Sequence, residues 1–422
     1  MRFSAAPTGR LDDPTQPWAV FGDRPGDPDG LEGNALAGVN LAQIAATPGA
    51  PMFDHESLFG AHMAGQAIDD SRDGPVVVFV HGFESEPRRP VKARAYSDNA
   101  HRKLFHFSEP DGGPGSAEER ALRITPWFAR AMLAEGVGPA DACHGVAVGY
   151  CFTSYGGSAR SFLPGPITRL ASRAGITRRW REPPDVYVSA YRDAEIAGYG
   201  LAAVLTQLRA RLDHAGQTER EIDILCHSLG ARTVLSALAL ISQRWPADST
   251  LSRISRVIML GGVCYLGQAA QALAHMGRAK GAALPHLYNV TSRSDDVLRF
   301  LAQHRAPQAA RAEAEEALAL DPARIRLLRA GRTIGRNGQP PHTLYAKFAQ
   351  PYPAWADIPL DDPATRRWGF HYGFDLRGRR TLSLGDHWLY WTHPGNWALY
   401  RAILHDREGW SAPEVAADLR TA

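Results

Sequence analysis

Three kinds of polar residue that can together carry out nucleophilic catalysis follow apolar runs in this sequence. Ser228 comes directly after the run "IDILC", within the pentapeptide "CHSLG". The adjacent carboxylates of Asp295 and Asp296 follow "HLYNV", and His387 lies in "LSLGDHWLYW". A serine hydroxyl is a poor nucleophile until a base removes its proton, and histidine can take up and return that proton near neutral pH. A carboxylate on the other imidazole nitrogen fixes the tautomer, so these residue types fit acyl transfer through a serine.

The elements that must position these residues alternate between strands and helices from residue 75 onward. We expect strands at 75–82, 144–151, 222–226, 256–265, 286–292 and, as the last one, 370–378. We expect helices within 118–135, over 190–215 and directly after Ser228. This alternation predicts an α/β fold with a mostly parallel central sheet and helices on both faces.

In such a sheet, ligands bind beyond the carboxyl ends of the strands. The loops at these ends carry "HGF" (81–83), Ser228, the aspartate pair and His387, which should therefore face the same edge. The chain order Ser…Asp…His is that of the α/β-hydrolases.

The motifs "FVHGF", "CHSLG", "SRSDDVL" and "GDHWLYW" resemble those of serine hydrolases with the α/β-hydrolase fold, a superfamily of esterases and lipases. The segments "GYCFTSYGG" (149–157) and "AYRDAEIAGYGLAAVLTQL" (190–208) are similar to a largely uncharacterised group of bacterial hydrolases with an A-H-S-M-G-type nucleophile elbow. The resemblance covers about 75–300 and 370–405 and implies the α/β-hydrolase fold for this chain.

The resemblance also implies a role for each matching residue. Ser228 matches the nucleophile, His387 the base and Asp295 the acid of a catalytic triad. The backbone N–H groups of Phe83 and Leu229 match the oxyanion hole, which stabilises the tetrahedral intermediate.

The sequence departs from the family at the elbow, where Cys226 replaces the first glycine of G-x-S-x-G. A serine on such an elbow adopts a strained positive φ, so the residues two before and two after it must be small. Cys226 is small enough, and Gly230 keeps the second position. We therefore expect Ser228 at positive φ, with Cys226 packed closely against a neighbouring element.

Each assignment has a competitor. Ser228 alone could equally be a helix N-cap, since serine is a preferred capping residue. Asp296 competes with Asp295 for the acid, and we favour Asp295. His371 and His393 compete with His387 for the base; His371 lies in an expected strand and His393 in a turn before proline. We interpret His81 and His227 as structural.

Composition narrows the class of protein. The chain has 422 residues, a net charge of +3 and 44% hydrophobic residues, which does not indicate a nucleic-acid-binding protein. Its 4 cysteines form no C-x-x-C pair, so neither a disulfide framework nor a metal site is expected. The acidic cluster at 23–32 misses the spacing of a calcium loop. Without an apolar secretory segment or a membrane span, the expected location is the cytoplasm.

For domain organisation, we expect a loop-rich N-terminal extension at 1–74, with a strand at 18–22 and a short helix near 36–46. The catalytic domain is expected at 75–415, with insertions at about 154–185 and 301–365. The Arg-, Gly- and Pro-rich insertion at 154–185 is either a lid over the site or a solvated surface segment.

The sequence thus predicts a serine hydrolase that cleaves a small-molecule carboxylic ester and needs no cofactor or metal. No nucleic acid and no stable membrane insertion is expected. An acyltransferase or thioesterase could use the same triad. A non-catalytic binding protein with the same fold is the alternative from another class.

Overall fold

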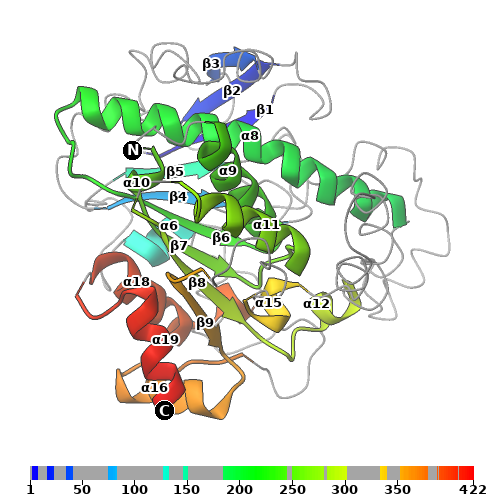
Figure 1. Cartoon of the computed structure of the whole chain (residues 1–422), viewed down its shortest axis with the longest axis vertical. Coiled ribbons are helices and arrows are strands. Elements are labelled where there is room, and N and C mark those ends of the chain that lie inside the picture. Colours follow the sequence, from blue (N-terminus) through cyan, green and yellow to red (C-terminus); the bar gives the residue numbers. More distant parts are fainter. Residues whose placement is uncertain are drawn as a thin grey trace, which may run out of the picture.

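A nine-stranded sheet forms the centre of the molecule, with strand order β3-β2-β1-β5-β4-β6-β7-β8-β9 (Figure 1). The computed structural model describes residues 2–7, 17–22, 35–40, 75–82, 127–132, 146–150, 184–244, 250–279, 283–301, 333–339, 352–378, 387, 389–406 and 408–422. The strands are β1 (Arg2–Pro7), β2 (Pro17–Gly22), β3 (Ala35–Asn40), β4 (Val76–Val80), β5 (Val146–Tyr150), β6 (Ile222–His227), β7 (Ile254–Leu260), β8 (His286–Thr291) and β9 (Trp355–Pro359).

The helices of the described residues cover the sheet. They are α6 (Trp127–Met132), α8 (Pro184–His214), α9 (Gly230–Arg244), α10 (Thr250–Arg253), α11 (Leu266–Met276), α12 (Asp296–Phe300), α15 (Ile334–Asn337), α16 (Pro363–His371), α17 (Leu389–Thr392), α18 (Pro394–His405) and α19 (Ala412–Thr421). The six strands from β5 to β9 in the sheet order are mutually parallel, as the sequence predicts for an α/β fold. Strand β1 continues this sheet parallel to β5, and β2 and β3 extend it antiparallel.

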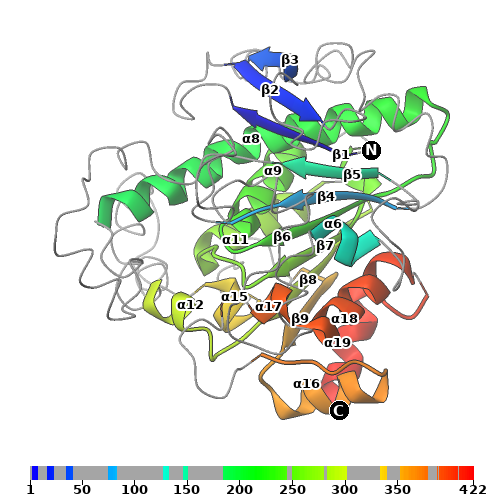
Figure 2. The ribbon, with the colours of Figure 1, turned by 180° about the vertical axis from the view of Figure 1, so that it is seen from behind.

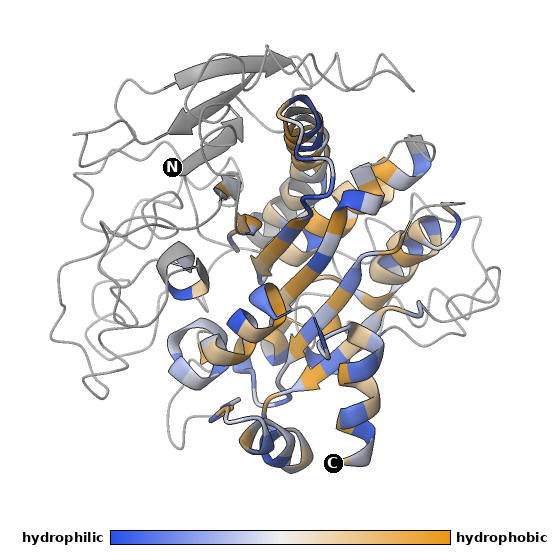
Figure 3. Cartoon of the chain, turned by 90° about the vertical axis from the view of Figure 1, so that its left-hand side faces the viewer, coloured by the Kyte–Doolittle hydropathy of each residue, from blue (hydrophilic) through white to orange (hydrophobic). Residues whose placement is uncertain are grey.

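Alternate residues of each strand point into two separate hydrophobic cores. On β4, Val76, Val78 and Val80 pack with α8, α9 and α11, whereas Val77 and Phe79 pack with α6 and α18. Figures 1 and 2 show these helices on opposite faces of the sheet, and Figure 3 shows the hydrophobic strands between them. A strand buried on both faces must be apolar throughout, which explains the unbroken run "VVVFV".

The order of the strands in the sheet indicates where a ligand would bind. From β4 the chain passes to β5 on one side, and then returns to β6 on the other side of β4. Right-handed crossovers in opposite directions put their helices on opposite faces of the sheet. The chain thus leaves β4 and β6 toward opposite sides of the sheet, and open α/β sheets bind ligands at such a switch in strand order.

Two expected elements are wrong. The last strand is β9 (Trp355–Pro359), within the range expected to be an insertion, and 370–378 is not a strand. Instead, the Asp362 side chain accepts a hydrogen bond from the Ala364 N–H at 2.8 Å and caps α16, whose first residue is Pro363. Near the N-terminus, the expected helix at 36–46 is contradicted by strand β3, whereas β2 contains the expected strand at 18–22.

Candidate active site

Ser228 lies at the sharp turn between β6 and α9 and has a φ of 55°. It is the one non-glycine residue with positive φ among those that the structure describes. The expectation of a positive φ is confirmed. An N-cap residue has negative, extended φ, so Ser228 is not an ordinary capping serine. A left-handed conformation costs a non-glycine residue about 1–3 kcal/mol, and such strain concentrates at functional sites.

The turn is held closed by backbone hydrogen bonds on both sides. The Ser228 N–H donates to the Leu260 carbonyl at 2.9 Å, and the Ser228 carbonyl accepts from the Val263 N–H at 2.9 Å. Both partners belong to β7 or to the loop that follows it. The strain at Ser228 is therefore offset by the neighbouring strand, and the turn is anchored to the sheet.

Small residues on either side of Ser228 are required by close packing. A Cβ atom at Gly230 would lie 2.7 Å from the carbonyl oxygens of Val80 and His81, and 3.3 Å from Cβ of Cys226. Cys226 is fully buried among the core residues below α9, as expected. Burial raises the pKa of the Cys226 thiol, so this cysteine stays protonated and is a poor nucleophile.

The loop after β4 meets the elbow directly. A Cβ atom at Gly82 would lie 2.7 Å from Cβ of Ser228, so only glycine fits between the two loops. Leu229 lies between Ser228 and Gly230, the first residue of α9. Its backbone N–H donates no hydrogen bond to any other described residue. Phe83, the other expected oxyanion donor, lies outside the described residues.

Asp295 and His387 form a buried pair at the same edge of the sheet. Nδ1 of His387 donates to Oδ2 of Asp295 at 2.7 Å. The His387 side chain is 4% exposed, and the Asp295 side chain is 0% exposed. The other carboxylate oxygen of Asp295 accepts from the Leu298 N–H and caps α12. Asp296 instead forms an ion pair with Arg299 near the surface, at 2.7 Å. The structure thus joins His387 to Asp295 and not to Asp296.

The loop that carries Asp295 is fixed by a second carboxylate. Asp361, which follows β9, accepts hydrogen bonds from both the backbone N–H and the hydroxyl of Ser294. The Ser292 hydroxyl donates to the Gly378 carbonyl at 3.0 Å. Both contacts come from the segment after β9, a strand that the sequence analysis did not predict. Asp361 and Ser294 therefore hold the loop that carries Asp295 in place, although neither residue was predicted to contribute to the site.

His227 connects the elbow to His387. Its Nε2 donates to the His387 carbonyl oxygen at 3.1 Å, and the two imidazole rings are 4.7 Å apart between centroids. This contact was not foreseen, because a strand pattern does not reveal a partner 160 residues away. The residue next to the elbow serine is therefore bonded to the segment that carries the expected base.

Aromatic side chains surround the two histidines. Trp127 packs edge-on against His227 at 6.1 Å and lies 6.1 Å from Trp391, while Tyr390 packs edge-on against His387 at 6.2 Å. Tyr390 is wholly buried, and its pKa is raised well above the usual range by burial first and by the Asp295 carboxylate next. Asp295, His387 and Ser228 therefore lie in apolar surroundings, where electrostatic interactions are stronger than in water.

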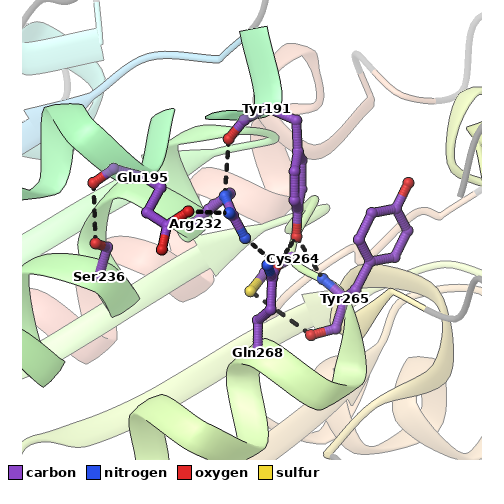
Figure 4. Close-up of polar contacts among 7 residues, drawn as sticks. All are labelled: Tyr191, Glu195, Arg232, Ser236, Cys264, Tyr265 and Gln268. Atoms are coloured by element: carbon purple, nitrogen blue, oxygen red, sulfur yellow. Dashed lines mark hydrogen bonds and ion pairs between the residues drawn. The ribbon is translucent and has the colours of Figure 1, made fainter. Parts of the chain in front are cut away.

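Arg232, in the first turn of α9, holds this helix against two neighbouring helices (Figure 4). Its guanidinium donates to the Tyr191 carbonyl at 2.8 Å, to Glu195 at 2.6 Å and to Gln268. It also stacks on the Tyr191 ring at 3.7 Å. Tyr191 and Glu195 belong to α8 and Gln268 to α11, so one buried cation links three helices beneath the elbow. We call these four residues the Arg232 cluster.

The competing histidines lie elsewhere. His371 is exposed at the end of α16, and His393 lies 3.9 Å from Asp375. His81 donates from Nδ1 to the Gly82 carbonyl at 2.8 Å. Within the described part of the chain, no group of three His, Cys, Asp or Glu side chains is arranged to hold a metal ion. The segment 154–185, interpreted as either a lid or a solvated surface insertion, lies almost wholly outside the described residues.

The fold defines an α/β protein with a largely parallel sheet, and the site lies at the carboxyl ends of its strands. Comparison with protein-family models, with curated proteins and with solved structures found no match to this chain. Among the helices that the structure describes, none combines the length and apolar character that crossing a bilayer requires.

Proposed function

We propose that the protein is a serine hydrolase with the α/β-hydrolase fold, which cleaves carboxylic esters through an acyl-enzyme intermediate. The observation that carries the proposal is the φ of 55° at Ser228. A strained serine at the turn between a central strand and a helix is the arrangement of the nucleophile elbow. The buried pair of His387 and Asp295, in the chain order Ser…Asp…His, supports the same proposal.

In the proposed reaction, Nε2 of His387 takes the hydroxyl proton as Oγ of Ser228 attacks the ester carbonyl carbon. The negative oxygen of the tetrahedral intermediate accepts hydrogen bonds from the backbone N–H groups of Leu229 and Phe83. His387 then gives its proton to the departing alcohol. A water molecule, activated by His387, cleaves the acyl–serine bond and regenerates the hydroxyl. Asp295 holds the imidazole in the tautomer with its proton on Nδ1 throughout.

The proposed substrate is a small neutral or moderately apolar ester. Trp127 packs against His227 and Tyr390 packs against both histidines, which favours an apolar acyl or alkyl group over a highly charged one. The proposal requires no metal or cofactor, because the hydroxyl is activated by a side-chain base. A cytoplasmic location remains part of this proposal.

The test is active-site labelling with a fluorophosphonate probe, together with hydrolysis of p-nitrophenyl esters of increasing acyl length. We expect the wild-type protein to be labelled, and Ser228→Ala to abolish both labelling and hydrolysis. Ser242→Ala is the matched control, since Ser242 is a buried serine on α9 whose hydroxyl donates to the Leu238 carbonyl within the same helix. Folded wild-type protein that neither reacts with the probe nor cleaves any of the esters would refute the proposal.

A further inference from the structure

His227 contacts the backbone of the histidine that is paired with Asp295, although it was expected to be merely structural. It is 2% exposed and lies between the elbow, α6 and the segment that begins at His387. A carbonyl oxygen can only accept, so the 3.1 Å contact with the His387 carbonyl requires a proton on Nε2 of His227. The contact therefore fixes the ring orientation of His227 as well as the backbone position of His387.

The two anchors of His387 come from different strands. Asp295, after β8, holds Nδ1 of the imidazole, and His227, at the end of β6, holds the backbone carbonyl. A side-chain anchor alone leaves the backbone free to shift, and a backbone anchor alone leaves the imidazole free to rotate. Together they fix both the position and the direction of Nε2, the nitrogen that must face the Ser228 hydroxyl.

The location of His227 makes it suited to this task. It directly precedes Ser228, and its backbone oxygen and Nδ1 would lie 3.0 Å and 3.2 Å from a Cβ at Gly82. The crowded contact with Gly82 leaves the ring little room to move. Any displacement of His227 would therefore also displace the elbow, so the base segment and the nucleophile are positioned by one rigid unit.

We infer that His227 is a positioning residue, which holds the base segment in register with the nucleophile through its hydrogen bond to the His387 carbonyl. This inference rests on the proposed function. A misplacement of about 1 Å between reacting groups can lower the rate by about 100-fold. Loss of the anchor should therefore lower kcat much more than it changes KM, because the substrate does not contact this bond.

Two variants separate the hydrogen bond from the bulk of the ring. His227→Gln can keep a donor near the position of Nε2, whereas His227→Leu fills similar space without a donor. We expect His227→Leu to lose about 10- to 100-fold in kcat with KM nearly unchanged, and His227→Gln to retain most of the wild-type kcat. Leu238→Ala, which removes buried bulk on α9 away from His227, is the control for lost stability and should keep its kcat below the melting temperature.

Amide hydrogen exchange over 389–392 gives a second readout that does not depend on activity. We expect faster exchange in His227→Leu than in the wild type, and near wild-type exchange in His227→Gln. Equal losses of kcat in both variants, or unchanged exchange in His227→Leu, would overturn the inference. If the folded wild type is inert toward the probe and the esters, the proposed function fails, and the exchange data alone decide whether His227 anchors the segment.

Discussion

Asp295 Oδ2 lies 2.7 Å from His387 Nδ1, although the two residues are 92 positions apart in the chain. Asp295 follows β8, and the last strand, β9, lies between the two in sequence. The pair is almost completely buried, and the second Asp295 oxygen is occupied by the Leu298 N–H. A carboxylate held at both oxygens cannot rotate away, so the imidazole orientation is fixed.

This pairing predicts different effects for the two neighbouring aspartates. Asp295→Asn should lower kcat by about 10³- to 10⁴-fold, because the amide no longer holds the imidazole in the required tautomer. Asp296→Asn should stay within about twofold of the wild type, since it removes only a surface ion pair with Arg299. The measurement is steady-state hydrolysis of a p-nitrophenyl ester. The reverse order of losses would assign the acid to Asp296.

The close packing around Ser228 predicts that one added methyl group at Gly230 lowers the free energy of unfolding. Gly230→Ala would place Cβ 2.7 Å from two backbone carbonyl oxygens, which cannot move without shifting β4 or its loop. We expect a loss of about 1–3 kcal/mol of unfolding free energy from this overpacking, measured by urea denaturation.

The control for this substitution is Gly277→Ala. Gly277 ends α11 with a φ of −64°, and an added Cβ would come no closer than 3.4 Å to a neighbouring atom among the described residues. Removing a glycine at a compatible position stabilises by up to about 1 kcal/mol, so this variant should unfold at the wild-type urea concentration or above. Equal stability of Gly230→Ala and Gly277→Ala would contradict the packing at the elbow.

The parts of the fold that sequence predicts well are the strands buried on both faces. β4, β6 and β8 are short, largely apolar runs that stop near Gly, Ser or Asp, a pattern typical of central strands in a parallel sheet. The same pattern places the loops that carry Ser228 and Asp295 at one edge of the sheet. The positive φ of Ser228 was expected from the resemblance of "CHSLG" to a nucleophile elbow, and the observed φ of 55° agrees with it.

The last strand could not be found in this way. β9 ("WADIP") carries a mostly buried aspartate, Asp357, at its centre, which a strand pattern counts as polar. Its carboxylate is satisfied by Asn289, Trp355 and the Gln339 N–H, each at 2.8 Å. None of these partners is recognisable before the fold is known. The contacts of His227 and Asp361 were missed for the same reason.

The Arg232 cluster predicts an asymmetry between its two charged members. Arg232→Met removes charged hydrogen bonds to the Tyr191 carbonyl and to Gln268, and a hydrogen bond to a charged group contributes about 1.5–3 kcal/mol to the free energy of unfolding. Glu195→Gln removes the charge but keeps an acceptor, and the Glu195 side chain is 49% exposed. We expect it to cost less than about 1 kcal/mol. Thermal and urea unfolding of the two variants measure the difference.

The matched control for the cluster is Arg209→Met, on the same helix as Glu195. Arg209 forms an i,i+4 pair with Asp213 near the surface, and such pairs contribute about 0.3–0.5 kcal/mol. The variant should therefore unfold close to the wild type. If Arg232→Met were no more destabilising than Arg209→Met, the cluster would not be what holds α9 against α8 and α11.

A buried carboxyl group away from the site predicts how stability changes with pH. Asp223 on β6 is fully buried, and burial raises its pKa from 3.8 to about 7, while the nearby Arg256 acts in the opposite direction. The folded state thus binds this proton more tightly than the unfolded chain. The contribution of Asp223 to stability is fully present below about pH 4 and is lost as the pH rises to about 7.

Asp223→Asn resembles the protonated side chain at every pH, so it avoids this loss. We expect it to match the wild type near pH 4 and to exceed it increasingly up to about pH 7, by at most about 1.4 kcal/mol for each pH unit. Asp296→Asn, which removes an ion pair with Arg299 near the surface, should show a nearly constant difference from the wild type. Urea unfolding at several pH values measures both. A stability difference for Asp223→Asn that does not change between about pH 4 and pH 7 would show that Asp223 stays ionised in the fold.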